Sequence, residues 1–316
     1  MIHTYLGMDI GSSVIRLALV RDGVVRQLAA LDIPNPQQQA DEILPDEVAQ
    51  ELRTLLRREQ MSVRHCALVL PLQTAFVRRV TLPWMTEKQL RLNLPYEFQD
   101  YIKGDQDKYF FDYAFVGQKT DENGTPVQME LLAAVASKEI IARCRAALRK
   151  VGLKLAVAVP EYLTYRNLIS AYEATNPQEH PTEYCIIDMG GSATRVHMYR
   201  GAFYETTQVI EHGSRWLGQA PKGAGGSQDD ERLRELCSTI AIEILRSINF
   251  YGFNTPGSDL RDVYLTSGIT KHPVLNEILR NNIPLHIHTL DELLPAIGRE
   301  QRFGAAVGAA LELMGR

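Results

Sequence analysis

The chain has 316 residues, 45% of them hydrophobic and 23% charged, so it can bury two cores of ordinary globular composition. Its 34 basic and 38 acidic residues give a net charge of −4, and the absence of any Lys/Arg run argues against a nucleic-acid partner. No apolar stretch reaches about 18 residues and no signal peptide opens the chain, so we expect a cytoplasmic protein without membrane insertion.

The first part of the chain alternates between strand and helix patterns. Gly11-Ser12-Ser13 joins the first two apolar runs in the manner of a hairpin turn, and Pro45 suits the first turn of the helix that follows. The predicted elements are strands over 4–10 and 14–20, a helix over 45–60, and strands over 66–70 and 76–82.

The next segment predicts a small α+β subdomain inserted over about 76–152. Asn123-Gly124 stands between two β-rich runs, which is the strongest short signal for a hairpin. The predicted elements are a helix over 86–101, strands over 109–116 and 128–136, and a helix over 138–151.

A polar, proline-flanked stretch at 176–181 predicts a hinge, so the two halves are 1–178 and 179–316. The second half contains a Gly-rich stretch over 213–230, which predicts a mobile loop. A small subdomain over about 206–259 is expected there. The predicted elements are a strand over 184–189, a helix over 231–251, a strand over 262–266 and helices over 273–281 and 303–314.

The cysteines and histidines predict no metal site. The four cysteines are scattered in apolar stretches and form no C-x-x-C pair, which is typical of buried thiols in a reducing compartment. His286 and His288 alternate along one strand and so share a face, but two ligands without a third indicate a solvated strand face.

An internal repeat supports the main functional hypothesis. Residues 9–21 align with residues 188–200 without a gap, and both copies follow an apolar strand and open a hairpin. The identical positions are Asp9 and Asp188, Gly11 and Gly190, Ser13 and Ser192, Arg16 and Arg195, and Arg21 and Arg200.

The hairpin geometry gives the repeat a chemical meaning. With a two-residue turn, Asp9 lies across from Arg16, and Asp188 lies across from Arg195. Unpaired amides at each tip can hold phosphate oxygens, glycine allows close approach, and a carboxylate can hold Mg²⁺ through water. Two ordinary hairpins with Asp–Arg pairs are the alternative, but two copies in register favour the functional interpretation.

These motifs resemble the actin-like ATPase superfamily and, within it, the PilM family of type IV pilus assembly proteins, relatives of FtsA. The resemblance implies an α/β fold, a duplicated actin-like (ribonuclease H-like) ATPase fold with the inserted subdomain and a last helix that returns to the first half. The similar segments are 7–16 and 188–194 (phosphate motifs), 265–275 (adenosine motif), 303–311 (last helix), 81–86 and 243–251.

The resemblance implies that the chain binds ATP and Mg²⁺. Asp9 and Asp188 would hold Mg²⁺ through water, with Gly11, Ser12, Ser13 and Arg16 on one side of the phosphates and Gly190, Gly191 and Ser192 on the other. Ser267 and Gly268 would approach the ribose or base, and Glu243 and Arg246 would reach the adenosine, although a solvated helical pair explains those two equally well. Ser267, His272 and Val274 depart from the adenosine motif.

Glu161 matches the position of a catalytic carboxylate in the heat-shock chaperone branch, and it equally suits a helix N-terminus that favours acids. Enzymatic activity therefore stays open, and we expect at most a slow ATPase.

The family implies a cytosolic scaffold that binds the N-terminal tail of a PilN-like inner-membrane protein, in the groove between the first half and the insert. Such a protein would be recruited to the inner face of the cytoplasmic membrane through this partner, with self-association left open. The alternatives are a small-molecule kinase of the same fold, which is usually longer, and an FtsA-like filament-forming protein, which ends in an amphipathic helix.

Overall fold

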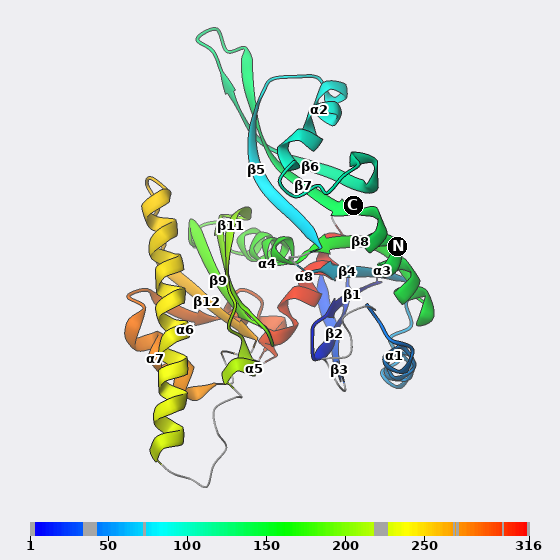
Figure 1. Cartoon of the computed structure of the whole chain (residues 1–316), viewed down its shortest axis with the longest axis vertical. Coiled ribbons are helices and arrows are strands. Elements are labelled where there is room, and N and C mark those ends of the chain that lie inside the picture. Colours follow the sequence, from blue (N-terminus) through cyan, green and yellow to red (C-terminus); the bar gives the residue numbers. More distant parts are fainter. Residues whose placement is uncertain are drawn as a thin grey trace.

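The computed structural model describes residues 4–33, 43–71, 74–217, 227–267, 269, 272–298 and 300–314. Two five-stranded sheets and one three-stranded sheet organise these residues (Figure 1). The first sheet has the order β3-β2-β1-β4-β8. Its strands are β1 (Thr4–Ile10), β2 (Val14–Arg21), β3 (Val24–Asp32), β4 (His65–Leu70) and β8 (Lys154–Pro160).

The second sheet repeats this arrangement, with the order β11-β10-β9-β12-β13. In each sheet three antiparallel strands are followed by two parallel ones, so the sequence repeat extends to a duplicated topology. The strands are β9 (Glu183–Met189), β10 (Thr194–Arg200), β11 (Phe203–Ile210), β12 (Asp262–Ser267) and β13 (His286–Thr289).

The helices separate and cover the two sheets. Alternate residues of a strand point to opposite faces, so Leu68 of β4 joins the buried cluster of α1 and α3, while Ala67 and Val69 join that of α4 and α8. The second sheet lies between α4 and α8 on one face and α6 and α7 on the other. These helices are α1 (Asp46–Arg58), α3 (Lys138–Lys150), α4 (Glu161–Thr175), α6 (Ser227–Asn254), α7 (Pro273–Asn282) and α8 (Gly304–Glu312).

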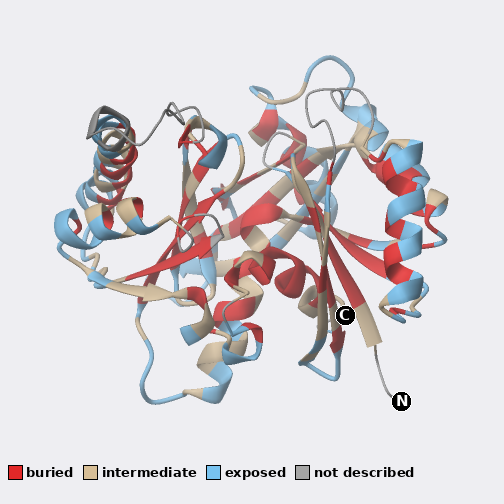
Figure 2. Ribbon diagram, turned by 90° about the horizontal axis from the view of Figure 1, so that it is seen from below, coloured by how far each residue is buried: buried red, intermediate tan, exposed pale blue. Residues whose placement is uncertain are grey.

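Helix α8 fills the middle of the molecule (Figure 1). A Cβ on Gly308 would lie 2.1 Å from the carbonyl oxygen of Thr164 in α4, and one on Gly7 of β1 would lie 1.8 Å from that of Ala306. Glycine therefore allows the helix to touch both neighbours by their backbones. The buried residues form a continuous band between the sheets, while the outer helices expose one face (Figure 2).

The three-stranded sheet has the order β5-β7-β6, with β5 (Ala75–Pro83), β6 (Tyr109–Thr120) and β7 (Pro126–Ser137). Its apolar face packs against α2 (Glu87–Asn93) and a 3₁₀ helix, Leu94–Phe98. The predicted turn at Asn123-Gly124 is confirmed: Gly124 has φ +80° and its amide donates to the Asp121 carbonyl at 3.0 Å.

Several predicted elements differ from the structure. One helix was expected over 86–101, but α2 ends at Asn93 and a 3₁₀ helix follows, because Pro95 has no amide to donate the next helical hydrogen bond. The loop expected over 213–230 contains a short helix, α5 (Ser214–Leu217), and α6 already begins at Ser227. Residues 218–226 lie outside the described residues.

The limits of the two halves, of the insert and of the subdomain over 206–259 stay predictions. Within the described ranges, no helix combines the length and the apolar character that a bilayer crossing requires.

Candidate functional site

Two equivalent hairpin tips meet where the two sheets face each other. The register places Asp9 opposite Arg16 and Asp188 opposite Arg195, which confirms both predicted pairings of strand positions. Both tips close in the same way, because Gly11 donates its amide to the Val14 carbonyl at 3.0 Å and the matching glycine of the second hairpin makes the matching bond at 2.9 Å.

A cavity of about 330 Å³ opens between the tips. It has the size of a small-ligand site, and ten predicted site residues line it. A Cβ on Gly191 would lie only 2.8 Å from the Ser12 hydroxyl, so the second tip closely approaches the first. The predicted site residues in the lining are Asp9, Gly11, Ser12, Ser13, Arg16, Glu161, Asp188, Gly190, Gly191 and Ser192. Arg195, the cross-strand neighbour of Asp188, also lines the cavity.

The charged pairs differ between the two hairpins. Arg16 donates from Nη1 to Asp9 Oδ2 at 2.9 Å, as the cross-strand position predicts. Arg195 instead forms its ion pair with Glu161, at 3.2 Å between Nε and Oε1. The expected Asp188–Arg195 pair is therefore replaced, because Glu161, at the start of α4, offers a carboxylate on the cavity side.

Asp188 has a different partner, which leaves one of its oxygens available. The Tyr165 hydroxyl donates to Asp188 Oδ2 at 2.9 Å, whereas Asp188 Oδ1 is buried and has no hydrogen-bond partner among the described residues. Burial raises the pKa of Asp9; Arg16 acts against this shift and the charge of Asp188 adds to it. The two carboxylates thus share one cavity, and the charge of Asp188 disfavours the ionisation of Asp9, an arrangement that a cation relieves.

The turn amides are available as donors. Among the described residues, no backbone carbonyl accepts from the amides of Ser12, Ser13, Gly191 or Ser192. The second tip is held from behind by Ser214 and Arg215, whose amides donate to the carbonyls of residues 190 and 191 at 2.9 and 3.0 Å. These amides belong to residues that line the cavity, and the carbonyls of residues 190 and 191 are already engaged.

These residues fit a nucleotide phosphate group with Mg²⁺. Unpaired turn amides and an arginine suit phosphate oxygens, and carboxylate oxygens suit Mg²⁺. Side chains larger than glycine would fill the cradle, since a Cβ on Gly190 would lie 2.8 Å from the Arg195 guanidinium.

The structure places the predicted adenosine residues elsewhere or leaves them undescribed. Ser267 ends β12 and its side chain is outside the description, as is all of Gly268. Glu243 lies on α6, 3.6 Å from His212, and Arg246 is an exposed residue of that helix. Neither of these α6 residues lines the cavity, so their contact with adenosine stays a prediction.

Tyr165 and His197 belong to the site but were not predicted. Tyr165 stands four residues after Glu161, so both lie on one face of α4. His197 stands two residues after Arg195 on β10 and therefore shares its strand face. Both could have been found by applying helix and strand periodicity to the residues around the motifs.

A second cavity, of about 370 Å³, lies beside the first. It is a groove between the first sheet and the three-stranded sheet, with an apolar lining and four charged side chains at its margins. Its lining includes Phe110, Phe111, Ala134, Val135, Val157, Val159 and Leu163, with Asp112, Arg145, Arg166 and Glu312.

A thin wall separates this groove from the first cavity. Leu70 lines both, and consecutive residues face opposite sides: Ile140 and Glu161 line the cavity, while Ile141 and Pro160 line the groove. Any shift of α3 or of the start of α4 therefore changes both spaces at once.

Comparison with known proteins gives one family and a set of similar folds. The model of the family described as type IV pilus assembly protein PilM matches residues 7–219. A solved PilM–PilN type IV pilus biogenesis complex is similar at 20% identity, with a TM-score of 0.76 and 98% of each chain covered. The ethanolamine utilization protein EutJ from Carboxydothermus hydrogenoformans is similar at 12% identity, with a TM-score of 0.56 over 98% of this chain and 89% of that one. No curated protein sequence matches. The duplicated sheets and these likenesses show the actin-like fold.

Proposed function

Because the chain belongs to the PilM family of type IV pilus assembly proteins, whose model matches residues 7–219, we propose that it is an ATP-binding scaffold of pilus assembly. Its partner is the N-terminal tail of a PilN-like inner-membrane protein, which recruits the scaffold to the inner face of the cytoplasmic membrane. The wall shared by the two cavities supports this proposal best, since it joins a nucleotide site to a peptide site.

The nucleotide phosphates are assigned to the cavity between the hairpin tips. Bound Mg²⁺ would neutralise the phosphate charge, and Asp9 and Asp188 would hold it through water. Arg16 stays beside Asp9 and presents a fixed positive charge, and the amides of Ser12 and Ser13 donate to phosphate oxygens from one side. Gly191 and Ser192 do so from the other.

The partner peptide is assigned to the groove beside the three-stranded sheet. Strand β8 is the outer strand of the first sheet, so it offers backbone groups to an added strand. Phe110 and Leu163 supply apolar contacts for alternate side chains, and Arg145 and Arg166 supply positive charge. This composition fits a short, extended, mainly apolar segment.

Nucleotide binding changes peptide affinity through the shared wall. Closure of the two halves on Mg-ATP moves the start of α4, since Glu161 pairs with Arg195 of the second half. Pro160, its neighbour, lines the groove. The peptide then has different affinity in the open and closed states, as coupling between two sites requires.

Hydrolysis is secondary in this proposal. The Glu161 carboxylate is engaged with Arg195, and a carboxylate that holds the two halves together has less freedom to orient an attacking water. Glu161→Gln keeps the shape of the side chain and should leave peptide binding largely intact.

The test measures the affinity of a labelled PilN-like N-terminal peptide by fluorescence anisotropy, with and without Mg-ATP. We expect Ala134→Arg, in the groove, to abolish binding, because a long charged side chain fills the apolar space. Ala114→Arg on exposed β6 is the matched control, because it adds the same side chain outside the groove lining.

The role of the nucleotide is tested with Asp9→Asn. This variant should bind the peptide with the same affinity as the wild type in the absence of nucleotide, and Mg-ATP should no longer change that affinity. Mg-ATP at about a hundred times its Kd should stabilise the wild type by about 2.7 kcal/mol in a thermal melt. Equal peptide affinity in all nucleotide states would refute the coupling, and absence of peptide binding would refute the scaffold.

A further inference from the structure

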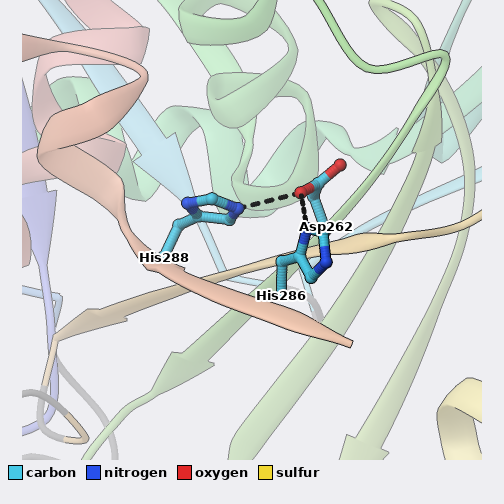
Figure 3. A group of neighbouring side chains, drawn as sticks. All are labelled: Asp262, His286 and His288. Carbon is cyan, nitrogen blue, oxygen red and sulfur yellow. Dashed lines mark hydrogen bonds and ion pairs between the residues drawn. The ribbon is translucent and has the colours of Figure 1, made fainter. Parts of the chain in front are cut away.

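One carboxylate and two imidazole side chains meet at the edge of the second sheet (Figure 3). Asp262 opens β12, and His286 and His288 belong to the outer strand β13. The parallel register pairs Asp262 with His286 and Tyr264 with His288, and a strand period of two puts all four side chains on one face. The sequence suggested two histidines without a third ligand; the neighbouring strand supplies that ligand.

The ligand atoms are close together. Asp262 Oδ1 lies 2.8 Å from His288 Nε2 and 3.6 Å from His286 Nδ1, and all three ligand atoms lie within 4.8 Å of one another. Ligands about 2.1 Å from a tetrahedral ion are separated by about 3.4 Å. Small side-chain rotations therefore suffice to surround an ion, and Figure 3 shows both rings directed at one carboxylate oxygen.

His288 is held in the orientation of a ligand. Its Nδ1 lies 2.7 Å from Glu292 Oε2, and the other oxygen of Glu292 accepts from the Thr289 amide at 3.1 Å. The ring also stacks on Tyr264, with 5.1 Å between ring centroids. A carboxylate behind the far nitrogen is the arrangement that orients histidine ligands in metal sites.

This arrangement leaves a place for a cation. When Nδ1 donates its proton to Glu292, Nε2 of His288 presents a lone pair to Asp262, which is also an acceptor. Two acceptors at 2.8 Å repel each other unless a proton or a metal ion lies between them. A proton satisfies only this pair, whereas a metal ion also engages His286.

We propose that Asp262, His286 and His288 bind a divalent transition metal of the Zn²⁺ class. Two imidazoles and one carboxylate suit Zn²⁺, whereas Mg²⁺ and Ca²⁺ prefer oxygen ligands throughout. Because the His286 side chain is 78% exposed, water completes the coordination from the solvent side. The ion ties the four-residue edge strand β13 to β12, the strand that leads to the predicted adenosine segment.

The test is a calorimetric titration of Zn²⁺ into the full, untagged chain without nucleotide, in a large excess of Mg²⁺ that occupies the carboxylates of the nucleotide cavity. We expect one equivalent to bind, and His286→Ala and His288→Ala each to weaken binding at least about tenfold. Glu292→Gln should weaken it about tenfold through the orientation of His288. The matched control is His65→Ala, an exposed histidine at the start of β4.

Hydrogen exchange supplies a second readout that does not depend on heat of binding. Zn²⁺ should slow amide exchange in His286–Thr289 in the wild type and not in His288→Ala. Absence of Zn²⁺ binding overturns the proposal. So does binding that survives both histidine substitutions, since the ion then sits elsewhere, for example at the buried group of Glu161, Asp188 and His197.

Discussion

His197 is a completely buried histidine beside the cavity between the two hairpin tips. Its Nδ1 lies 2.8 Å from the Thr207 hydroxyl, and its Nε2 has no hydrogen-bond partner among the described residues. Burial lowers the pKa of His197 to about 3, with Asp188 acting against the shift and Arg195 adding to it. The ring is therefore neutral in the folded protein at any pH near neutrality.

This depressed pKa predicts a loss of stability in mild acid. Between the unfolded pKa of about 6.5 and the folded value of about 3, the unfolded state binds a proton that the folded state does not. The free energy of unfolding should therefore fall by up to about 1.4 kcal/mol for each unit by which the pH is lowered within this range. Urea unfolding at several pH values should show this slope, and His197→Gln should reduce it.

His65→Gln serves as the control, because an exposed histidine should leave the slope as it is in the wild type. An unchanged slope in His197→Gln would show that other groups cause the acid sensitivity.

The residues of the site could be predicted only as far as the repeat extends. Asp9 and Arg16 were recovered as a pair because strand register depends on the turn length alone. The partner of Arg195 could not be predicted, because Glu161 belongs to a helix whose position depends on the packing of the whole first half. Asp262 was not predicted as a neighbour of His286 and His288 for the same reason. The order of strands in a sheet depends on the topology of the whole fold and cannot be derived from the local sequence.

At the scale of elements, the crossing of α8 with α4 depends on glycine. We expect Gly308→Ala to destabilise the protein by about 1–3 kcal/mol or more, because the added methyl would lie 2.1 Å from the backbone oxygen of Thr164. Gly252→Ala is the matched control, since this glycine of α6 has open space around its Cβ position. There the same change should stabilise the helix by up to about 1 kcal/mol.

Chemical denaturation of the two variants measures the difference directly. Equal and small changes in both would show that α8 and α4 can move apart without loss, which would contradict the tight crossing.

Two elements with a strong local signal were predicted, whereas two other local signals were overlooked. The hairpin at Asn123-Gly124 follows from turn chemistry, and α1 follows from its apolar face. The prediction of one helix over 86–101 did not take Pro95 into account, although proline is a local signal for the end of a helix. Strand β8 was not predicted, although Leu155, Val157 and Val159 recur with a strand period of two, which is also a local signal.

At the scale of the molecule, one ion pair joins the three-stranded sheet to the second half. Arg79 of β5 contacts Glu205 of β11, and its guanidinium also lies 3.6 Å from Glu130 of β7. A partly exposed pair contributes at most about 1 kcal/mol to stability. Its position is more informative, since it connects the three-stranded sheet, which lines the groove, with the half that carries the second hairpin.

Arg79→Ala should therefore change the melting temperature little and reduce the effect of Mg-ATP on peptide affinity. The measurement is the peptide titration with and without nucleotide, and the change is the ratio of the two dissociation constants. Arg91→Ala, which removes an exposed pair within α2, is the control. Full coupling in Arg79→Ala would show that the link between the halves runs through α4 alone.

The central place of α8 has a consequence for the order in which the protein is made. Strand β1 leaves the ribosome well before α8, because Ala306, which covers its Gly7, lies some 300 positions later. The face of the first sheet that α8 covers therefore stays exposed until α8 has been synthesised. During that interval the uncovered apolar face is exposed to other molecules, and the contacts of α8 with both sheets form only after α8 has been made.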